Sequence, residues 1–399
     1  MLRENFLRFI YEAASMQRWN DHIRPHKGFT ELDKQAHKLF YAYVIGRFEE
    51  DEGKPVDWTK LIEGAIFEFF HRILLTDIKP PVFHKLMEKQ GEQINRLVLA
   101  MLKDKGVYEI EPEMKHRIER YFLEAGWCCH EKRILKASHF LATNWEFDIV
   151  YRLSSNFYRL EETKKIIDGQ VEEHYDISGV QKLLLHKNSK DFLNLVGQLR
   201  FQQRWAQTPR VPETSVAGHM LIVAVLSYML SLQVNACGKR KYNNFFAGLF
   251  HDMPEVLTRD IISPVKNSIE GLGELIKEIE DRQMEEVIYP LLPGSWQEEI
   301  RYFTENEFKS KIKTKKGLEL VTSEDINSRF NEDAFTPVDG EIIEFCDKFA
   351  AYMEAYLSMK HGITSNNLKE GHRQLYQKYR SSTVAGVDAG MMFDYFIEY

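Results

Sequence analysis

The sequence from Phe245 to Pro254 is Phe-Phe-Ala-Gly-Leu-Phe-His-Asp-Met-Pro, an apolar run that ends in a charged pair and a proline. Pro254 disfavours α conformation at the residue before it. We therefore expect a buried helix that ends near His251 and Asp252, where two adjacent side chains can converge on one ion. A His-Asp dipeptide alone is a weak sign of a metal site, because most such pairs are incidental.

Helical periodicity dominates the chain on both sides of this segment. Apolar residues recur at three- and four-residue steps from Asp57 to Phe70 and from Ser215 to Leu232. Asp57 is a candidate cap of the first of these helices, and another helix is expected from Glu341 to Met359. Few stretches alternate with period two, so the pattern predicts an all-α protein.

The composition is typical of a soluble globular protein. The chain has 399 residues, enough for two domains, with 44% hydrophobic and 28% charged residues. A net charge of −7 does not favour a nucleic-acid partner. We see no apolar run of the length that crosses a bilayer, so no membrane partner is expected. Four cysteines in so long a chain do not form a disulfide framework, which predicts a cytoplasmic protein.

The two halves of the chain share short blocks in the same order, which predicts a tandem duplication. Gln17-Arg18-Trp19 recurs as Gln203-Arg204-Trp205, and Arg120-Tyr121-Phe122 recurs as Arg301-Tyr302-Phe303, at a slowly drifting offset. We expect two helical domains, at residues 1–165 and 189–399, with a linker within 161–188. The second domain carries a lysine-rich insertion at about 306–340, which is either a lid or a solvated loop.

Four side chains of the second half suit one divalent cation: His219, His251, Asp252 and Asp347. Neutral imidazoles and carboxylates bind Mn²⁺, Co²⁺, Fe²⁺, Mg²⁺ or Zn²⁺ and leave coordination positions open. A phosphate oxygen and an attacking water could take those positions. Taken singly, His219 on its apolar helix is more often a core histidine, and Asp347 a carboxylate paired with a lysine. The prediction therefore depends on the ordered set.

These residues resemble a known family. The stretch from His251 to Asp260, followed by Pro264-Val265-Lys266, is similar to the signature of the HD-domain superfamily, and more closely to that of bacterial HD-domain 5′-deoxynucleotidases. The resemblance runs from about Phe192 to Gly371. It implies two HD-type helical bundles in this duplicated chain and one divalent metal ion. It also implies hydrolysis of (deoxy)nucleoside 5′-monophosphates by a metal-activated water.

The resemblance also implies roles for five residues around the metal. Glu255 matches the residue that orients or activates the water, and Asp260 matches a second acidic residue of the pocket. Arg204 matches a phosphate contact, Trp205 a sugar contact, and Lys266 adds positive charge nearby. The chain departs from the family at Gly218, where a glutamate usually precedes the first ligand histidine, and this bears on the substrate.

The first half is expected to lack the metal centre. In our alignment His37 takes the place of His219 and Asp148 that of Asp347, but Glu68 and Phe69 stand in place of the central pair. Arg72 falls at the position of Glu255, where it would repel a cation. His71 restores a ligand only if the register shifts. We therefore predict an inactive first half.

Members of this family commonly pair as dimers, so we expect the two halves to pack as an intrachain pseudo-dimer. Further oligomerisation is left open. Arg18-Trp19 predicts a retained nucleotide pocket, unless Trp19 is simply part of the core. Three functions remain: a phosphohydrolase of nucleotide 5′-monophosphates, a nucleotide phosphodiesterase or triphosphohydrolase, and a non-catalytic nucleotide-sensing protein.

Overall fold

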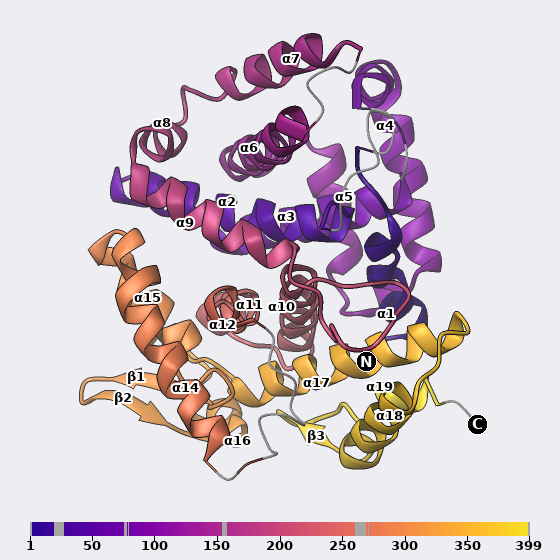
Figure 1. Ribbon diagram of the computed structural model, residues 1–399, viewed down its shortest axis with the longest axis vertical. Helices are drawn as coiled ribbons and strands as arrows, with labels where there is room; N and C mark the ends of the chain where they lie inside the picture. Colours follow the sequence, from indigo (N-terminus) through magenta and orange to yellow (C-terminus); the bar gives the residue numbers. More distant parts are fainter. Residues whose placement is uncertain are drawn as a thin grey trace.

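The protein is described by a computed structural model that covers residues 2–19, 28–75, 78, 80–153, 158–259, 269 and 271–397. Within these residues the fold is helical apart from two short antiparallel strand pairs, which confirms the all-α prediction. Figure 1 shows most helices of the first half in the upper part of the view and those of the second half in the lower part.

The first half consists of long helices joined by short turns. Its helices are α1 (Glu4–Tyr11), α2 (Glu31–Asp51), α3 (Trp58–Leu74), α4 (Pro80–Asp104), α5 (Met114–Leu123) and α6 (Cys129–Leu153). Three further helices lead into the second half: α7 (Leu160–Glu172), α8 (Ser178–Leu185) and α9 (Lys187–Gly197). Short 3-10 turns cover Glu12–Ser15, Val107–Glu109 and Gln198–Arg200.

The second half has more irregular connections. Its helices are α10 (Val216–Gln233), α11 (Gly238–Phe250), α12 (Glu255–Thr258), α14 (Leu272–Gln283), α15 (Gly294–Thr304), α16 (Ser323–Asp325), α17 (Gly340–Lys360), α18 (Asn366–Tyr379) and α19 (Met391–Asp394). The strands β1 (Lys311–Thr314) and β2 (Gly317–Leu320) form one hairpin, and β3 (Thr383–Val384) and β4 (Val387–Asp388) the other. Short 3-10 or π turns cover Met284–Ile288, Tyr289–Leu291, Ile326–Phe330 and Asp333–Phe335.

Two central helices, α2 and α10, organise the core. Every residue of α10 from Val216 to Leu232 is buried, in keeping with its apolar sequence. Both helices begin at a hydroxyl cap: the Ser215 hydroxyl accepts a hydrogen bond from the backbone of Gly218, and Thr30 forms a capping box with Asp33. These caps fix where each helix begins, and therefore which residues face the neighbouring helices.

Helix α10 corrects one expectation of the sequence analysis. Its 18 residues are long and apolar enough to cross a membrane by length and composition, although no such run was expected. In the structure 89% of this stretch is buried inside the protein. Its apolar surface is covered by other helices of the chain, as in the core helix of a globular protein.

Three predicted helices are confirmed, with ends that lie within a few residues of the predicted ones: α3 with its Asp57 cap, α10, and α17.

Two segments differ from expectation. The linker expected within 161–188 is mostly helical, because Ile167, Val180 and Leu183 are buried along α7 and α8. The insertion is only partly exposed: β2 faces solvent, whereas Lys311 and Ile312 of β1 are buried.

The two halves share one hydrophobic core in the described part of the chain. The ring of Phe40 on α2 lies 5.2 Å from that of Phe250 on α11. At the cap of α10, the Ser215 hydroxyl donates a hydrogen bond to Asp33 of the first half. The Tyr228 hydroxyl on α10 donates to Glu63 on α3 at 2.9 Å. The two halves therefore pack against each other, while the duplication and the pseudo-dimer of its copies stay predictions.

Candidate metal centre

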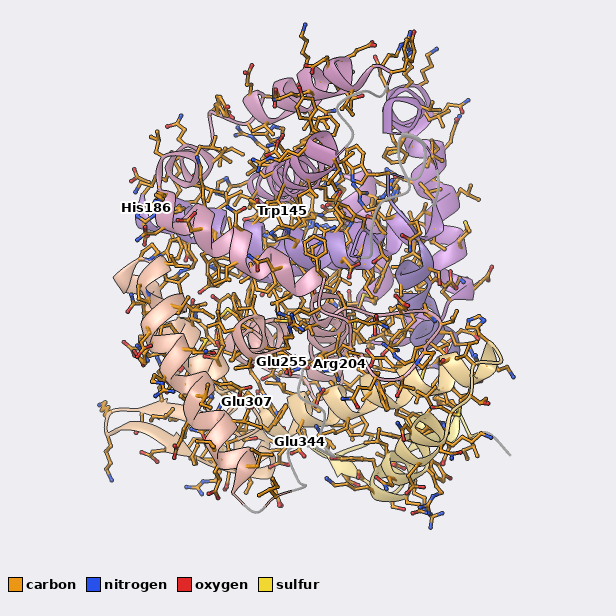
Figure 2. All side chains as sticks on the ribbon, viewed as in Figure 1. Trp145, His186, Arg204, Glu255, Glu307 and Glu344 are labelled. Atoms are coloured by element: carbon orange, nitrogen blue, oxygen red, sulfur yellow. The ribbon has the colours of Figure 1, made fainter. Side chains whose placement is uncertain are left out.

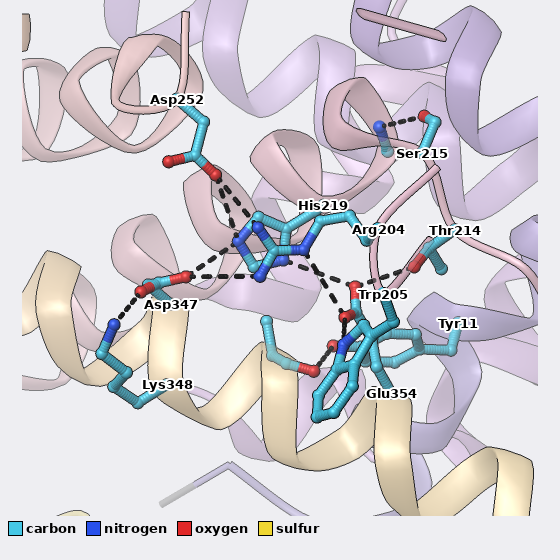
Figure 3. Close-up of polar contacts among 12 residues, drawn as sticks. Tyr11, Arg204, Trp205, Thr214, Ser215, His219, Asp252, Asp347, Lys348 and Glu354 are labelled. Carbon is cyan, nitrogen blue, oxygen red and sulfur yellow. Dashed lines mark hydrogen bonds and ion pairs between the residues drawn. The ribbon is translucent and has the colours of Figure 1, made fainter. Parts of the chain in front are cut away.

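Three helices of the second half bring the predicted ligands together. His219 lies in the first turn of α10, directly after the capped residues. Helix α11 ends at Phe250, so His251 is its C-cap residue and Asp252 follows, in keeping with the stop expected from Pro254. Asp347 lies in the middle of the long helix α17. Figure 3 shows His219, Asp252 and Asp347 pointing toward a common point.

The distances define a compact cluster. His219, His251 and Asp347 each offer a ligand atom, and these three atoms lie within 4.8 Å of one another. His219 Nε2 is 2.9 Å from Asp347 Oδ1. Asp252 borders the cluster, with its Oδ2 at 3.2 Å from His251 Nε2 and 3.7 Å from His219 Nε2. The structure thus brings all four residues to one place, three of them as a tight group.

The orientation of His251 fits a metal ligand. Its Nδ1 lies 2.8 Å from the carbonyl oxygen of Gly248, one helical turn earlier, so Nδ1 carries the proton and donates it there. Its buried Nε2 has no hydrogen-bond donor among the residues that the structure describes. A ligating histidine commonly donates its other ring N–H to a backbone carbonyl, which fixes the tautomer. The lone pair of Nε2 therefore faces the cluster.

The two carboxylates are held in their charged form. Burial alone would raise the pKa of Asp252, but His251 and Arg204 outweigh burial and the pKa lies well below its usual range. Burial is likewise outweighed at Asp347, whose pKa is lowered well below normal by Lys348 and His219. Lys348 Nζ lies 2.7 Å from Asp347 Oδ2. Ionised carboxylates are the form that binds a divalent cation.

Arg204 and Trp205 line the same site. Arg204 lies 3.4 Å from Asp252 Oδ2 through one terminal nitrogen and 4.0 Å from Asp347 Oδ1 through the other. Trp205 has a positive φ of 57° and donates from its indole nitrogen to Glu354 at 2.9 Å. Both side chains are therefore held beside the cluster, where the sequence analysis placed a phosphate and a sugar contact.

Glu354 is a site residue that sequence reasoning missed. Its carboxylate accepts hydrogen bonds from Trp205 and from the Thr214 hydroxyl, the latter at 2.8 Å, and lies 3.5 Å from His219 Nδ1. Although burial opposes it, Arg210 and Arg204 hold the pKa of Glu354 well below its usual range. Glu354 comes seven residues after Asp347, two helical turns along the same face of α17, and this spacing is the signal that could have identified it.

The remaining predicted site residues have different outcomes. Glu255 is the first residue of α12 and is buried, and the neighbouring Val256 carbonyl accepts a hydrogen bond from Gln202 at 3.3 Å. Figure 2 labels Glu255 and Arg204 in the same region of the molecule. Asp260 and Lys266 lie outside the described residues, so their roles stay predictions.

A side chain at Gly218 would collide with residues of the first half. A Cβ at Gly218 would lie 2.9 Å from Leu32 Cδ2 and 3.3 Å from Asp33 Oδ1, both on α2. The carboxylate of Asp33 thus lies beside the position where related enzymes usually have a glutamate. The Asp33 carboxylate accepts the hydrogen bond from the Ser215 hydroxyl, so the first half contacts the start of α10 directly.

Comparisons with known proteins agree with this geometry. Residues 196–376 match the family model described as HD domain. Part of the chain is similar to a 5′-deoxynucleotidase of Vibrio atlanticus, with 29% identity over 120 residues, 29% of this chain and 61% of that protein. A 5′-deoxynucleotidase of Vibrio vulnificus is 29% identical over 119 residues, 28% of this chain and 59% of that protein. One of Photobacterium profundum is 30% identical over 111 residues, 27% of this chain and 57% of that protein.

The second half of the chain is therefore an HD domain. Within the HD-domain class, it resembles the 5′-deoxynucleotidases. The chain spans between 57% and 61% of the length of these curated relatives.

Proposed function

We propose that the second half is a metal-dependent phosphohydrolase of nucleotide phosphoesters. The observation that carries the proposal is the cluster of His219, His251 and Asp347, whose ligand atoms lie within 4.8 Å of one another. The match to the HD-domain family and the 5′-deoxynucleotidase activity of the relatives support the same class of reaction. The buried Nε2 of His251 meets no hydrogen-bond donor in the described part of the chain, and its neighbour there is another predicted ligand, the Asp252 carboxylate at 3.2 Å.

The two imidazoles and two carboxylates of the cluster fit one divalent ion, and Mn²⁺, Co²⁺, Fe²⁺, Mg²⁺ and Zn²⁺ are the candidates. His219, His251, Asp252 and Asp347 would hold it. When bound, such an ion lowers the pKa of a coordinated water and neutralises phosphate charge. Gly248 and Glu354 keep the two imidazoles oriented, because they lie against the Nδ1 atoms on the side away from the cluster.

Arg204 and Trp205 are the proposed substrate contacts. The planar guanidinium of Arg204 offers two parallel donors to a phosphate, and it is only 12% exposed beside the cluster. Trp205 offers a rigid apolar wall to the sugar, and its bond to Glu354 fixes the ring. Glu255 is the proposed proton acceptor for the attacking water, with Asp260 as a second acid and Lys266 as an added positive charge.

The proposed substrates are (deoxy)nucleoside 5′-monophosphates in the cytoplasm. The 5′-deoxynucleotidase activity of the relatives and the proposed pair of phosphate and sugar contacts support this choice over a phosphodiester or a triphosphate. A non-catalytic nucleotide sensor is the rival from another class. The described residues hold one cluster of possible metal ligands, which does not favour a reaction that needs a second metal ion.

Turnover by the metal-loaded full-length protein tests the proposal. It should release phosphate from at least one nucleoside 5′-monophosphate in a panel that also includes triphosphates and cyclic nucleotides. Loss of a residue that only supports a metal ligand commonly lowers activity about 10- to 100-fold. Because Asp252 is itself a proposed ligand, Asp252→Ala should lower the rate by more than about 100-fold. The exposed Asp388→Ala is the matched control and should keep full activity. Hydrolysis of none of the nucleotides would favour the sensor.

A further inference from the structure

The first half repeats the local structure around Arg204 and Trp205. Trp19 has a positive φ of 62°, against 57° at Trp205. The Trp19 indole donates to Glu146 at 2.9 Å, as Trp205 donates to Glu354 at 2.9 Å. Arg18 also contacts the same glutamate, with its Nε 3.0 Å from Glu146 Oε2. An arginine and a tryptophan are thus held by one buried carboxylate in each half.

The helix caps then fix which residues of the first half correspond to metal ligands. Thr30 caps α2 as Ser215 caps α10, and the fourth residue after each cap is Lys34 and His219 respectively. His37 lies a turn further along α2, where its Nε2 contacts the Leu193 carbonyl at 3.0 Å. We therefore align Lys34, and not His37, with His219, because the alignment counts positions from the helix cap and not from the matching residue type.

The other two positions follow in the same way. His139 comes seven residues before Glu146, as Asp347 comes seven residues before Glu354. Phe70-His71-Arg72 near the end of α3 matches Phe250-His251-Asp252 at the end of α11. In this alignment Arg72 corresponds to Asp252, and His71 corresponds to His251. The pair His71-Arg72 takes the place that the sequence comparison gave to Glu68-Phe69, and His139 takes the place that it gave to Asp148.

At these positions the first half has other residue types than the predicted metal ligands. Lys34 stands in place of His219, Arg72 in place of Asp252, and His139 in place of Asp347. We call Arg18, Lys34, Arg72 and His139 the basic pocket. Two buried carboxylates border it: Glu31 pairs with Arg18 and Arg72, and Glu146 pairs with Arg18. Lys34 Nζ lies 2.7 Å from His139 Nδ1, and no carboxylate of the described residues lies within 4 Å of that ammonium. Burial, with Arg18 nearby, holds the pKa of Lys34 well below its usual range. An anion placed beside Lys34 would favour the charged form of the amine.

The exposure of the basic pocket matches that of the metal centre. The Arg18 side chain is 14% exposed and that of Arg204 is 12%. Arg72 is 19% exposed, against 17% for Asp252. Lys34 is fully buried, as His219 nearly is. The side chains of the first half are thus exposed to the same small extent as their counterparts in the second half.

We propose that the basic pocket binds the phosphate group of a nucleotide without a metal ion. In the second half a divalent cation would supply the charge that attracts phosphate. In the first half Lys34 and Arg72 supply positive charge at the corresponding positions. Arg18 stands beside them with its guanidinium bound to Glu146 and Glu31, so Lys34 carries the donors that face the phosphate. Lys34 has three N–H donors, and the His139 ring is the acceptor that the described residues offer it. Trp19 stands where the sugar would lie.

Binding of deoxyadenosine 5′-monophosphate to the chelator-treated full-length protein tests this inference, measured by isothermal titration calorimetry. We expect one equivalent of nucleotide to bind, with inorganic phosphate as a competitor and deoxyadenosine without effect. Lys34→Met, which removes the charge but keeps the length of the side chain, should weaken binding at least tenfold. Arg204→Gln, the matched change in the second half, should leave this binding in place.

Several outcomes would overturn the proposal. The first is that the wild-type protein does not bind the nucleotide. The second is that Arg204→Gln loses binding while Lys34→Met keeps it. The third is that deoxyadenosine competes with the nucleotide and inorganic phosphate does not. If circular dichroism shows that Lys34→Met does not fold, Arg72→Gln replaces it, because the Arg72 side chain is partly exposed. Unchanged affinity in a folded Arg72→Gln protein would then contradict the inference. None of these readouts depends on turnover by the second half, so they are separate from the test of the proposed function.

Discussion

Glu354 connects the parts of the metal centre at the scale of single residues. It accepts hydrogen bonds from Trp205 and Thr214, lies 3.5 Å from His219 Nδ1, and lies 3.6 Å from Arg204 Nε. A carboxylate behind a ligating imidazole orients the ring and raises its basicity. The single residue therefore positions one predicted metal ligand and both predicted substrate contacts.

Glu354→Gln should lower the affinity for a divalent ion by about 10- to 100-fold, the range typical of a partner behind a metal ligand. The amide keeps the shape but loses the charge that faces His219 and Arg204. Calorimetric titration with Mn²⁺ measures the change. Glu332→Gln, at an exposed position of the same half, is the control and should bind normally. Unaltered affinity in Glu354→Gln would show that Glu354 does not support the metal ligand.

The close contact between α10 and α11 positions the two histidines at the scale of elements. A Cβ at Gly248 on α11 would lie 3.0 Å from the Ala224 Cα and 3.1 Å from its backbone nitrogen, both on α10. The Gly248 carbonyl also accepts the hydrogen bond from His251. A glycine at this position lets the helices approach closely enough for His219 and His251 to face one ion.

Gly248→Ala should therefore destabilise the protein by about 1–3 kcal/mol, the usual cost of overpacking, although alanine is the better helix former. The free energy of unfolding in urea measures it. Gly169→Ala is the control, because a Cβ at Gly169 on α7 meets no atom within 4 Å. That change should leave stability the same or raise it by up to about 1 kcal/mol. Equal stability of the two variants would contradict the close-contact account.

The elements of the first half are joined by a buried ion-pair network. Glu146 on α6 pairs with Arg18 and Arg200, and although burial opposes it these two cations lower the pKa of Glu146 to about 2. Because the pKa is lower in the folded state, the unfolded state binds more protons as the solution is acidified. The pairing therefore stabilises the fold above about pH 4.5, the ordinary value of a glutamate, and this stabilisation is lost toward pH 2.

Glu146→Gln should be less stable than the wild-type protein by about 3 kcal/mol near pH 7, the equivalent of the lowered pKa. The difference should shrink as the pH falls from about 4.5 toward 2. Urea unfolding at pH 7 and at pH 3 provides the comparison. A difference that is the same at both values would mean that the charge of Glu146 does not stabilise the fold.

Much of the molecule follows from the sequence where periodicity or an ordered set of residues carries the information. The helices α3, α10 and α17 and the convergence of His219, His251 and Asp347 were predictable in this way. The correspondence that we propose for the first half was not, because it counts from the hydroxyl cap at Thr30 and so pairs Lys34, and not His37, with His219. A cap is a local hydrogen bond that a comparison of residue types overlooks.

At the scale of the whole molecule, the two halves share one core. The proposed alignment places cationic side chains of the first half where the second half has predicted metal ligands. The second half has histidines and carboxylates that suit a cation, and the first half has Lys34 and Arg72. Within the described residues the possible metal ligands form one cluster, which belongs to the second half. The chain should therefore bind one divalent ion.

The metal content of the full-length protein after loading with Mn²⁺ and removal of excess ion tests this most directly. We predict one ion per chain in the wild-type protein and none retained in His251→Ala, because the lone pair of His251 Nε2 faces the cluster. Two ions per chain, or one ion that persists in His251→Ala, would contradict the account.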